Sequence, residues 1–317
     1  MLSELVDKHP IITDILQYRA LQKLQSTYIE ALPREVNPHT GRIHTTFMQA
    51  VTATGRLSSN QPNLQNIPIR TPQGSQIRKA FVPRNADYTL LSADYSQIEL
   101  RVIAALSEED HMIEAFLQGQ DIHRSTAAKV FGVPLEAVTK EQRSHAKTVN
   151  FGIIYGVSAI GLSQQTSLSR SQSKELIDTY YQTYPKLKGY IEKQIAFARE
   201  HGYVETILGR RRYLPDIHSR NQVVRGAAER NAVNAPIQGS AADIIKVAMV
   251  RIAQRLEKEK MATRMLLQVH DELLFDVPKA ELEVVTPLIR EEMQNAYQLA
   301  VPLIVEIGTG SNWLEAH

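Results

Sequence analysis

The chain has 317 residues, of which 43% are hydrophobic and none is cysteine, and its formal net charge at pH 7 is only +2. This length suffices for a buried core in about two domains, and the lack of cysteine excludes disulfides, thiolate metal ligands and cysteine nucleophiles. Charged residues interrupt the first 16 positions and every longer apolar run, so we expect neither a secretory signal nor a membrane-spanning helix, and a cytoplasmic location.

The first part of the chain predicts one helix, a loop-rich segment and one buried strand. Apolar residues recur at helical spacing among charges over residues 11–32, which predicts an amphipathic helix. Residues 38–83 contain glycine and proline at short intervals, as in loops that join short strands. Residues 88–93 form an apolar run that predicts a buried strand, which ends at Asp94.

The second part predicts helices followed by strands. Residues 97–201 have mostly helical periodicity, after which a hairpin and a long helix through residues 241–258 are expected. The run MLLQVHDELLFDV, residues 265–277, predicts two antiparallel strands joined by a tight turn at its polar centre. A last helix and a short strand over residues 303–307 complete a chain of the α+β class.

Two carboxylates, Asp94 and Asp271, lie at the tips of predicted strands. If the strands 88–93 and 265–269 are neighbours, these groups meet at one edge of a sheet, where their repulsion raises a pKa unless a cation neutralises it. Magnesium suits such a pair, because it binds carboxylates together with substrate phosphates, and two ions can assist a phosphoryl displacement. For either Asp taken alone, a cap of a helix or turn is the commoner use.

The stretch EQRSHAKTVNFGIIYG, residues 141–156, places two cations and two aromatic residues four positions apart. On a helix, Arg143, Lys147, Phe151 and Tyr155 form one stripe. A triphosphate fits this stripe, since a guanidinium grips phosphate oxygens as a fork, an ammonium acts as a point charge, and a phenyl ring packs on a sugar or base. The alternative is an ordinary surface helix with solvated cations and buried rings.

Three of these segments, in this order, resemble the polymerase motifs of family A DNA polymerases, the bacterial DNA polymerase I family. They are DYSQIELR (residues 94–101), residues 143–156, and VHDE (residues 269–272). The likeness extends over nearly the whole chain through TATGRLSSNQPNLQNIPIR (52–70), DIHRSTA (121–127), GRRRYLPDI (209–217) and NAPIQGSAADIIK (234–246). The chain departs from the family pattern at Ser144, where many members have a second arginine, and at Arg212, an added charge.

The resemblance implies a right-hand polymerase fold with an antiparallel palm sheet, helical fingers and a remnant of the thumb. Residues 1–32 would be the base helix of the thumb, residues 33–107 the first part of the palm, residues 108–215 the fingers and residues 216–317 the second part of the palm. Family members carry more thumb helices, and usually an exonuclease-like domain, ahead of the region that matches Leu2. We therefore expect a truncated thumb.

The resemblance also implies the reaction, which is template-directed addition of deoxynucleotides to a primer 3′ hydroxyl with release of pyrophosphate. Asp94, Asp271 and the backbone carbonyl of Tyr95 would hold two magnesium ions, for which manganese can substitute. Lys147 would support charge on the leaving group, and Glu272 would be a supporting acid. Glu99, held by Tyr155, would fill the space that a ribose 2′ hydroxyl needs. The nucleotide-binding residues implied are Gln97, Glu99, His123, Arg143, Lys147, Phe151 and Tyr155.

Donors that face the minor groove of DNA are a separate expectation. Acceptors there are common to all correct base pairs, so donors check pair geometry without reading sequence. The candidates in family-like segments are Arg56, Asn63, Gln65, Arg230, Asn234, Gln238 and His270. For any one of them, a hydrogen bond within the protein is about as common. The basic run 210–212 is expected to face phosphates, with a solvated turn as the alternative.

The expected partners are primer-template DNA and deoxynucleoside triphosphates, bound by a monomer that acts at the bacterial nucleoid without a membrane. Two other classes remain open. A metal-dependent nuclease would also use paired carboxylates, but it has no need for the stripe 143–155. The second class is a catalytically weak DNA-binding fragment of a polymerase. Its catalytic motifs look intact, but the expected start of the chain inside the thumb would weaken its activity.

Overall fold

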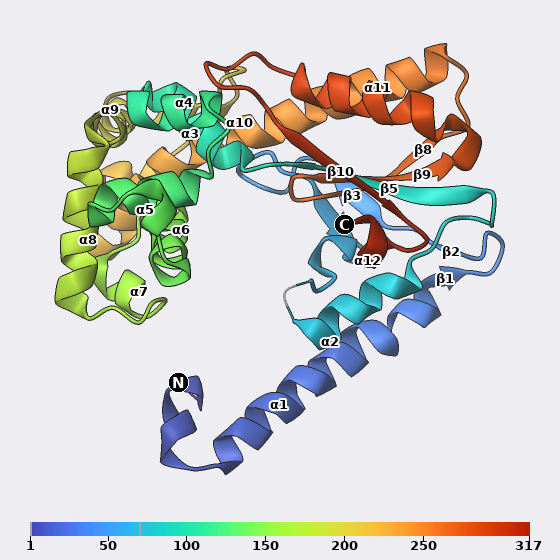
Figure 1. Cartoon of the computed structure of the whole chain (residues 1–317), viewed down its shortest axis with the longest axis horizontal. Coiled ribbons are helices and arrows are strands. Elements are labelled where there is room, and N and C mark those ends of the chain that lie inside the picture. Colours follow the sequence, from blue (N-terminus) through green and yellow to red (C-terminus); the bar gives the residue numbers. More distant parts are fainter. Residues whose placement is uncertain (1, 70) are drawn as a thin grey trace.

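A four-stranded antiparallel sheet lies at the centre of the fold in the computed structural model, which describes residues 2–69 and 71–317 (Figure 1). The strands, in spatial order, are β10 (Val305–Gly310), β5 (Tyr88–Tyr95), β9 (Glu272–Pro278) and β8 (Arg264–Val269). Leu90, Leu91 and Ala93 are almost fully buried, so β5 is covered on both faces, as its apolar run predicts. The sequence prediction of β5 and of the β8–β9 pair is confirmed.

Strands β5 and β8, which would bring the two carboxylates together if they were neighbours, are not adjacent in the sheet. β5 pairs with β9, with Asp94 opposite Glu272, and β8 lies beyond β9 at the edge of the sheet. The two candidate carboxylates still meet, because the tight turn between β8 and β9 folds back over the end of β5. There the amide of Tyr95 donates a hydrogen bond to the carbonyl of Asp271 at 3.2 Å.

The other strands form short two-stranded pairs outside the central sheet. Three two-stranded pairs form: β1 (Val36–Asn37) with β2 (Arg42–Ile43), β3 (Thr46–Met48) with β4 (Ser58–Asn60), and β6 (Tyr203–Glu205) with β7 (Arg211–Tyr213). The last pair is the hairpin predicted after Gly202. The final strand begins two residues later than the expected 303–307 and ends at Gly310, because it stays paired along β5 as far as Leu90.

Seven helices between β5 and the β6–β7 hairpin form a separate lobe beside the sheet (Figure 1). They are α3 (Ile98–Ser107), α4 (Asp110–Leu117), α5 (Ile122–Phe131), α6 (Lys140–Ile154), α7 (Ala159–Ser163), α8 (Arg170–Thr183) and α9 (Pro185–His201). Side-chain caps define several of their starts. The Thr139 hydroxyl accepts from the amide of Gln142 in a capping box that begins α6, and the Asp121 carboxylate accepts from two amides at the start of α5.

The remaining helices are α2 (Pro72–Ser75), α10 (Gln222–Lys258), α11 (Leu282–Gln294) and α12 (Trp313–Ala316). Turns of 3-10 helix cover Leu2–Lys8, Leu32–Glu35, Leu64–Asn66, Gln76–Ala80, Leu135–Ala137, Pro215–His218 and Lys279–Glu281. Helix α10 has 37 residues, of which the predicted segment 241–258 is only the second half. It runs behind the helical lobe toward the sheet (Figure 1), and its buried residues belong to the main core, which the sheet and the lobe share, and to a small core beside the β6–β7 hairpin.

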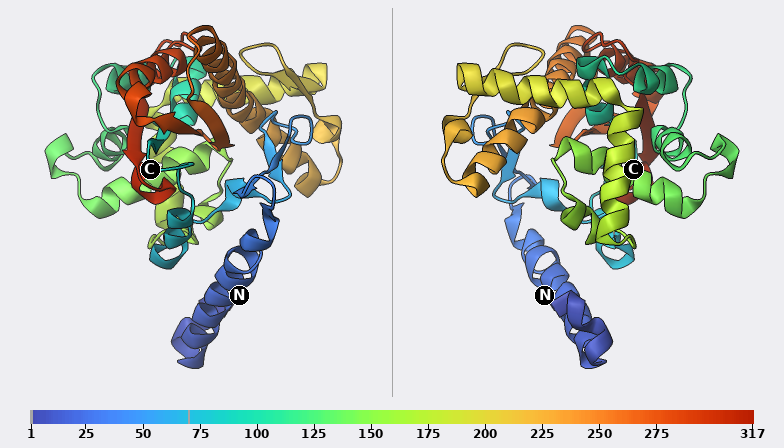
Figure 2. Two further views of the ribbon diagram at one scale, coloured as in Figure 1. Left: turned by 90° about the vertical axis from the view of Figure 1, so that its right-hand side faces the viewer. Right: turned by 90° about the vertical axis from the view of Figure 1, so that its left-hand side faces the viewer.

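The N-terminal helix contradicts the expected amphipathic packing of residues 11–32. The regular α-helix α1 covers only Ile11–Leu24 and buries no residue, with Ile11 51% and Leu21 47% exposed. Its apolar residues are spread around the helix instead of sharing one face, so no side can pack. A π-helical turn, Gln25–Ile29, follows, and Tyr28 anchors it through a hydrogen bond to the carbonyl of Asn66 at 2.6 Å. Figure 2 shows α1 projecting away from the rest of the molecule.

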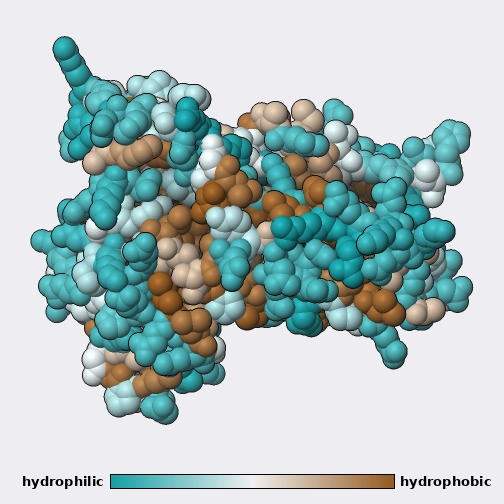
Figure 3. Space-filling model, turned by 90° about the horizontal axis from the view of Figure 1, so that it is seen from above, coloured by the Kyte–Doolittle hydropathy of each residue, from teal (hydrophilic) through white to brown (hydrophobic). Residues whose placement is uncertain are grey.

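One face of the molecular surface is mostly polar (Figure 3). Hydrophilic residues cover most of the face seen in Figure 3, and hydrophobic residues gather in patches across its middle. Within residues 2–69 and 71–317, no helix combines the length and the apolar character that a membrane span requires.

One half-buried, hydrogen-bonded carboxylate in the fold predicts a pH dependence of stability. Glu281 accepts hydrogen bonds from the amide of Ala262 at 2.8 Å and from the amide and hydroxyl of Thr263 at 3.0 and 2.7 Å. Burial raises the pKa of Glu281, but the hydrogen bonds together lower it by more than burial raises it. The pKa therefore lies below its ordinary value. The stabilisation is therefore present above the ordinary pKa and is lost as the pH falls through the depressed one.

We expect Glu281→Ala to lower the free energy of unfolding by about 1–2 kcal/mol at pH 7, and by less as the pH falls below about 4. Urea unfolding of the variant and of the original chain at several pH values measures this difference. Glu283→Ala removes an exposed carboxylate two residues away and serves as the control. A destabilisation by Glu281→Ala that stays constant with pH would contradict the ionised form of this cap.

Candidate functional site

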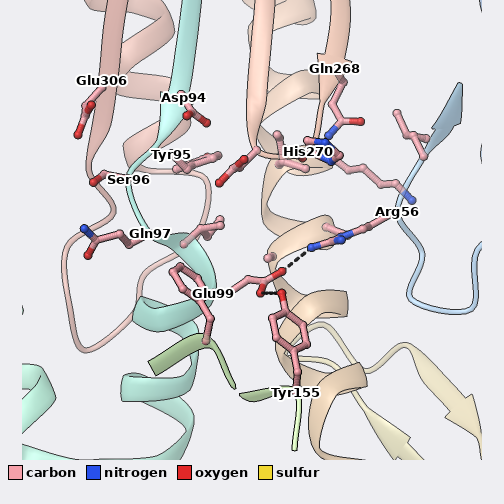
Figure 4. Close-up of a pocket in the computed structure, with 18 residues that line it drawn as sticks. Arg56, Asp94, Tyr95, Ser96, Gln97, Glu99, Tyr155, Gln268, His270 and Glu306 are labelled. Atoms are coloured by element: carbon pink, nitrogen blue, oxygen red, sulfur yellow. Dashed lines mark hydrogen bonds and ion pairs between the residues drawn. The ribbon is translucent and has the colours of Figure 1, made fainter. Parts of the chain in front are cut away.

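A cleft of about 510 Å³ opens where the end of the central sheet meets the helical lobe (Figure 4). This volume is in the range of small-molecule sites. The candidate residues that line it come from four separate segments of the chain: Arg56, Asp94, Tyr95, Gln97, Glu99, Phe151, Tyr155, His270 and Asp271. Residues that no sequence motif marked for a role also line it: Ser96, Lys246, Gln268 and Glu306.

The carboxylates of Asp94 and Asp271 both line the cleft, close enough for the charge of Asp271 to repel that of Asp94. One carboxylate oxygen of Asp94, Oδ1, is buried and has no hydrogen-bond partner in the part of the chain that the structure describes. Burial and the charges of Asp271 and Glu272 raise the pKa of Asp94 to about 7, and burial also raises the pKa of Asp271. A buried, unpartnered carboxylate oxygen beside a second carboxylate has the chemistry of a site for a hard cation.

The two carboxylates do not form a complete metal site by themselves. Among residues 2–69 and 71–317, no three or more acidic or histidine side chains cluster closely enough to hold a metal ion. An ion here would need further oxygen atoms, from the backbone, water or a substrate phosphate. The backbone of Tyr95 follows Asp94 directly, and its amide bonds to the backbone carbonyl of Asp271.

Glu272 is buried on the far side of the turn, where its carboxylate is already bonded. It accepts hydrogen bonds from the Ser92 hydroxyl and from the Trp313 indole, each at 2.8 Å. The His317 ring lies 3.4 Å from its second oxygen, and the Arg78 guanidinium lies 3.6 Å from the same oxygen. Burial raises the pKa of Glu272, but the hydrogen bonds from His317, Trp313 and Ser92 lower it below the ordinary value. No sequence signal indicated these partners.

Glu99 lies in the first turn of α3 and is held from two directions (Figure 4). The Tyr155 hydroxyl donates to one of its oxygens at 2.7 Å, and the Arg56 guanidinium pairs with the other. Burial and the charge of Glu99 raise the pKa of Tyr155, so its hydroxyl stays protonated and can donate. The Glu99 side chain is therefore a fixed wall of the cleft. Gln97, which precedes it, adopts a left-handed backbone with φ 56° and begins the helix.

The stripe on α6 leads from the cleft outward. Phe151 and Tyr155 line the cleft, whereas Lys147 lies further out on the helix and is exposed. Arg143 forms an ion pair with Asp121 at 2.7 Å. His123 is buried near Phe151, with 5.6 Å between the ring centroids, and burial lowers its pKa to about 4. The helix thus presents two cations and two rings along one line, as its spacing predicts.

Besides Arg56, which pairs with Glu99, two more of the candidate DNA donors are engaged within the protein. The Gln65 amide group accepts from the amide of Ser59 at 3.0 Å and donates to Gln268 at 3.1 Å. Asn63 caps the amide of Gln65 at 3.0 Å. Gln268 also donates to the carbonyl of His270, whose φ is 57°, so this buried side chain shapes the tight turn before Asp271.

The other donors lie on α10 and near it. Arg230, Asn234 and Gln238 are spaced four residues apart and therefore share one face of this helix. Arg230 packs closely on Gly156, where an added Cβ would lie 2.7 Å from the Arg230 Cγ. This close approach explains the glycine at the end of the α6 segment. Arg70, at the end of the family-like segment 52–70, lies outside the described residues.

Arg210 departs from the expectation for the basic run 210–212. Arg210 is turned into the protein, where it donates to Asp243 at 3.0 Å, to the carbonyl of Thr54 at 2.6 Å and to the carbonyl of Gly239 at 3.1 Å. It joins the 206–210 loop, helix α10 and the loop that carries Arg56, so it does not face phosphates. The sequence showed only the positive charge, whereas the three acceptors come from segments distant in the chain.

Comparisons with known proteins give one consistent result. A model of DNA polymerase family A matches residues 1–315. The thermostable DNA polymerase I of Thermus aquaticus is 52% identical over 316 residues, which cover 100% of this chain and 38% of that protein. DNA polymerase I of Pseudomonas aeruginosa is 54% identical over 303 residues, which cover 96% of this chain and 33% of that protein. The chain thus spans less than two fifths of the length of these relatives.

A solved structure shows the same fold. The polymerase domain of Pol1 from M. smegmatis, in complex with a DNA primer-template and dNTP, matches with a TM-score of 0.95 and 48% identity. The match covers 99% of this chain and 56% of that chain. The expected α+β fold of a polymerase domain is therefore confirmed.

Proposed function

We propose, from the premise that the chain belongs to DNA polymerase family A, that it adds deoxynucleotides to the 3′ hydroxyl of a DNA primer under the direction of a template strand. The observation that carries this proposal is the buried, unpartnered oxygen of Asp94 beside Asp271, at the floor of a cleft whose wall continues into the α6 stripe. A phosphoryl transfer needs this combination of a cation site and a phosphate-binding surface.

The carboxylates supply the site for the metal. When bound by Asp94, Asp271 and the backbone carbonyl of Tyr95, two Mg²⁺ ions, or Mn²⁺ in their place, would lower the pKa of the primer hydroxyl and neutralise the leaving pyrophosphate. The raised pKa of Asp94 supports this assignment, because a bound cation would offset both the burial and the repulsion that raise it. Glu272 supports this site indirectly, because its hydrogen bonds to Ser92 and Trp313 hold the turn that carries Asp271.

The incoming nucleotide is proposed to lie along α6. Arg143 and Lys147 bind the triphosphate, Lys147 supports charge on the leaving group, and Phe151 packs on the sugar or base. His123 donates to the triphosphate. Glu99, fixed by Tyr155 and Arg56, occupies the space next to the sugar 2′ position, and Gln97 completes the wall.

The primer-template is proposed to lie across the cleft. Arg56 and His270 are in the cleft itself, and Arg230, Asn234 and Gln238 present one face of α10. The internal bonds of Asn63 and Gln65 support a role for these two in holding the backbone that carries the other donors. In this arrangement residues 1–32 are the base of the thumb, 33–107 and 216–317 the palm, and 108–215 the fingers, and the chain acts as a monomer in the bacterial cytoplasm.

A primer-extension experiment tests the proposal. A labelled primer-template is incubated with the protein under three conditions: four deoxynucleoside triphosphates with Mg²⁺, the same triphosphates with a chelator, and Mg²⁺ without nucleotides. We expect extension in the first condition alone. Shortening of the primer in the third condition would indicate a nuclease. Binding of the duplex without extension in the first would indicate a DNA-binding fragment, and either outcome would contradict the proposal.

A further inference from the structure

We propose that Asn150, which no sequence motif marked, is a positioning residue that fixes the tautomer of His123 so that its Nε2–H points to the nucleotide. The Nδ2 amide of Asn150 lies 3.0 Å from Nδ1 of His123. An amide nitrogen can only donate, so Nδ1 must accept and the ring proton must be on Nε2. This inference rests on the proposed function, because it assigns the donor for a triphosphate at that same site.

The Asn150 amide belongs to a buried hydrogen-bonded chain that contains two hydroxyl groups. The Thr126 hydroxyl lies 3.2 Å from both Oδ1 and Nδ2 of Asn150, and 3.0 Å from the hydroxyl of Tyr184. Burial raises the pKa of Tyr184 to about 12, so Tyr184 keeps its proton. In the proposed arrangement Tyr184 donates to Thr126, and Thr126 donates to the amide oxygen. The amide nitrogen is then directed at His123. Asn150 and Tyr184 are 0% exposed, so water does not compete for these bonds.

The charge state of His123 makes the tautomer important. Burial lowers the pKa of His123 to about 4, with Asp121 raising it and Arg143 and Lys147 lowering it. The ring is therefore neutral at pH 7 and carries a single N–H. If that proton were on Nδ1, Nε2 would present a lone pair and repel a phosphate oxygen. With the proton on Nε2, the same ring donates a hydrogen bond to it.

Position and direction of the ring both support this role. The backbone of His123 is fixed by the Asp121 cap, which accepts from its amide at 2.9 Å and also pairs with Arg143. Nε2 has no hydrogen-bond partner among the described residues. It is also not fully buried, so a ligand atom can reach it. A buried ring thus has one nitrogen bonded internally and the other free to donate, next to Phe151 of the stripe.

The tautomer can be measured without any reaction. Long-range ¹H–¹⁵N spectra of protein labelled at histidine distinguish a proton on Nε2 from one on Nδ1, and His123→Ala identifies the signals. We expect the Nε2–H form of His123 from pH 8 to about pH 5, and a shift of that signal when a deoxynucleoside triphosphate is added. A proton on Nδ1, or a charged ring at pH 7, would overturn the inference.

Kinetics of single nucleotide addition test the consequence for binding. Asn150→Leu removes the donor at similar volume, and we expect KM for the nucleotide to rise about tenfold with a smaller change in kcat. Asn150→Asp can accept from Nδ1–H and stabilise the doubly protonated ring, so it should restore much of the affinity at low pH and lose it as the pH rises. An unchanged KM for Asn150→Leu would refute the positioning role.

Two controls separate this role from a general loss of packing. In a His123→Ala background, Asn150→Leu should raise KM no further, because Asn150 acts through the ring. Ser173→Ala, which removes a buried hydroxyl without a described partner on α8, should leave KM and the His123 spectrum unchanged. If the original chain adds no nucleotide at all, the proposed function fails, while the spectra and the triphosphate titration still decide the tautomer and its ligand.

Discussion

Asp94→Ala and Asp271→Ala are each expected to reduce the rate of nucleotide addition by about a thousandfold or more, while primer-template binding changes less than about threefold. Loss of a metal ligand removes several kcal/mol of transition-state stabilisation, and about 4 kcal/mol corresponds to this factor. DNA affinity is retained because it depends on donors elsewhere in the cleft and on α10. Neither variant should be less stable, since each removes a buried charge that another carboxylate repels.

Single-turnover extension at saturating DNA measures the rate, and fluorescence anisotropy of a labelled duplex measures binding. Glu306→Ala is the matched control, because Glu306 lies opposite Asp94 in the sheet register but is exposed. It should retain most of the activity. Titration with Mn²⁺, followed by its paramagnetic signal, should show weakened ion binding in the two Asp variants. Extension by Asp271→Ala at a rate near that of the original chain would remove Asp271 from the metal site.

The second large effect is expected in the choice between deoxyribonucleotides and ribonucleotides. Glu99→Ala should raise the relative kcat/KM for a ribonucleotide about 10- to 200-fold, because a steric difference of this size is worth about 1–3 kcal/mol. The ion pair with Arg56 and the hydrogen bond from Tyr155 prevent Glu99 from moving aside, so its removal, and not its rearrangement, opens the space.

Two further variants separate volume from charge at this position. Glu99→Gln keeps the size of the side chain and should discriminate almost as well as the original residue. Tyr155→Phe keeps the ring but removes the bond to Glu99, and a modest loss of discrimination is expected because Arg56 still holds the carboxylate. The ratio of kcat/KM for matched ribonucleotides and deoxyribonucleotides is the quantity to compare. An unchanged ratio in Glu99→Ala would contradict a steric wall.

Much of the fold could be predicted because its elements have local patterns. The apolar run of β5 and the polar centre of residues 265–277 predict strands and a tight turn, and the four-residue spacing on α6 predicts its stripe. The order of the strands could not be predicted, since a strand that is apolar on both faces pairs equally well with either neighbour. The packing expected for the helix of residues 11–32 was wrong, because helical spacing alone does not indicate whether a partner surface is present.

The candidate site shows the same division. Asp94, Asp271 and the α6 residues are indicated by their position at strand tips or by spacing, and the family resemblance supplies their roles. Gln268, Asn150 and Trp313 lie in segments whose local pattern does not indicate their partners, because the tertiary fold brings these partners close. Arg210 illustrates the opposite error, because a run of positive charge in the sequence includes one guanidinium that three internal acceptors surround.

Helix α10 has a consequence for how the molecule opens. Ala228 and Ala232 pack in the small core beside the β6–β7 hairpin, whereas Ile244 and Ile252 pack in the main core with the sheet. Because one continuous helix belongs to both cores, neither can unfold without disturbing the other, and the two should behave as one cooperative unit. Amides in the centre of α10 and in β5 should exchange hydrogen only through global unfolding. The amides of α1, which buries no residue, should exchange through local fraying, and a protease should cut there first.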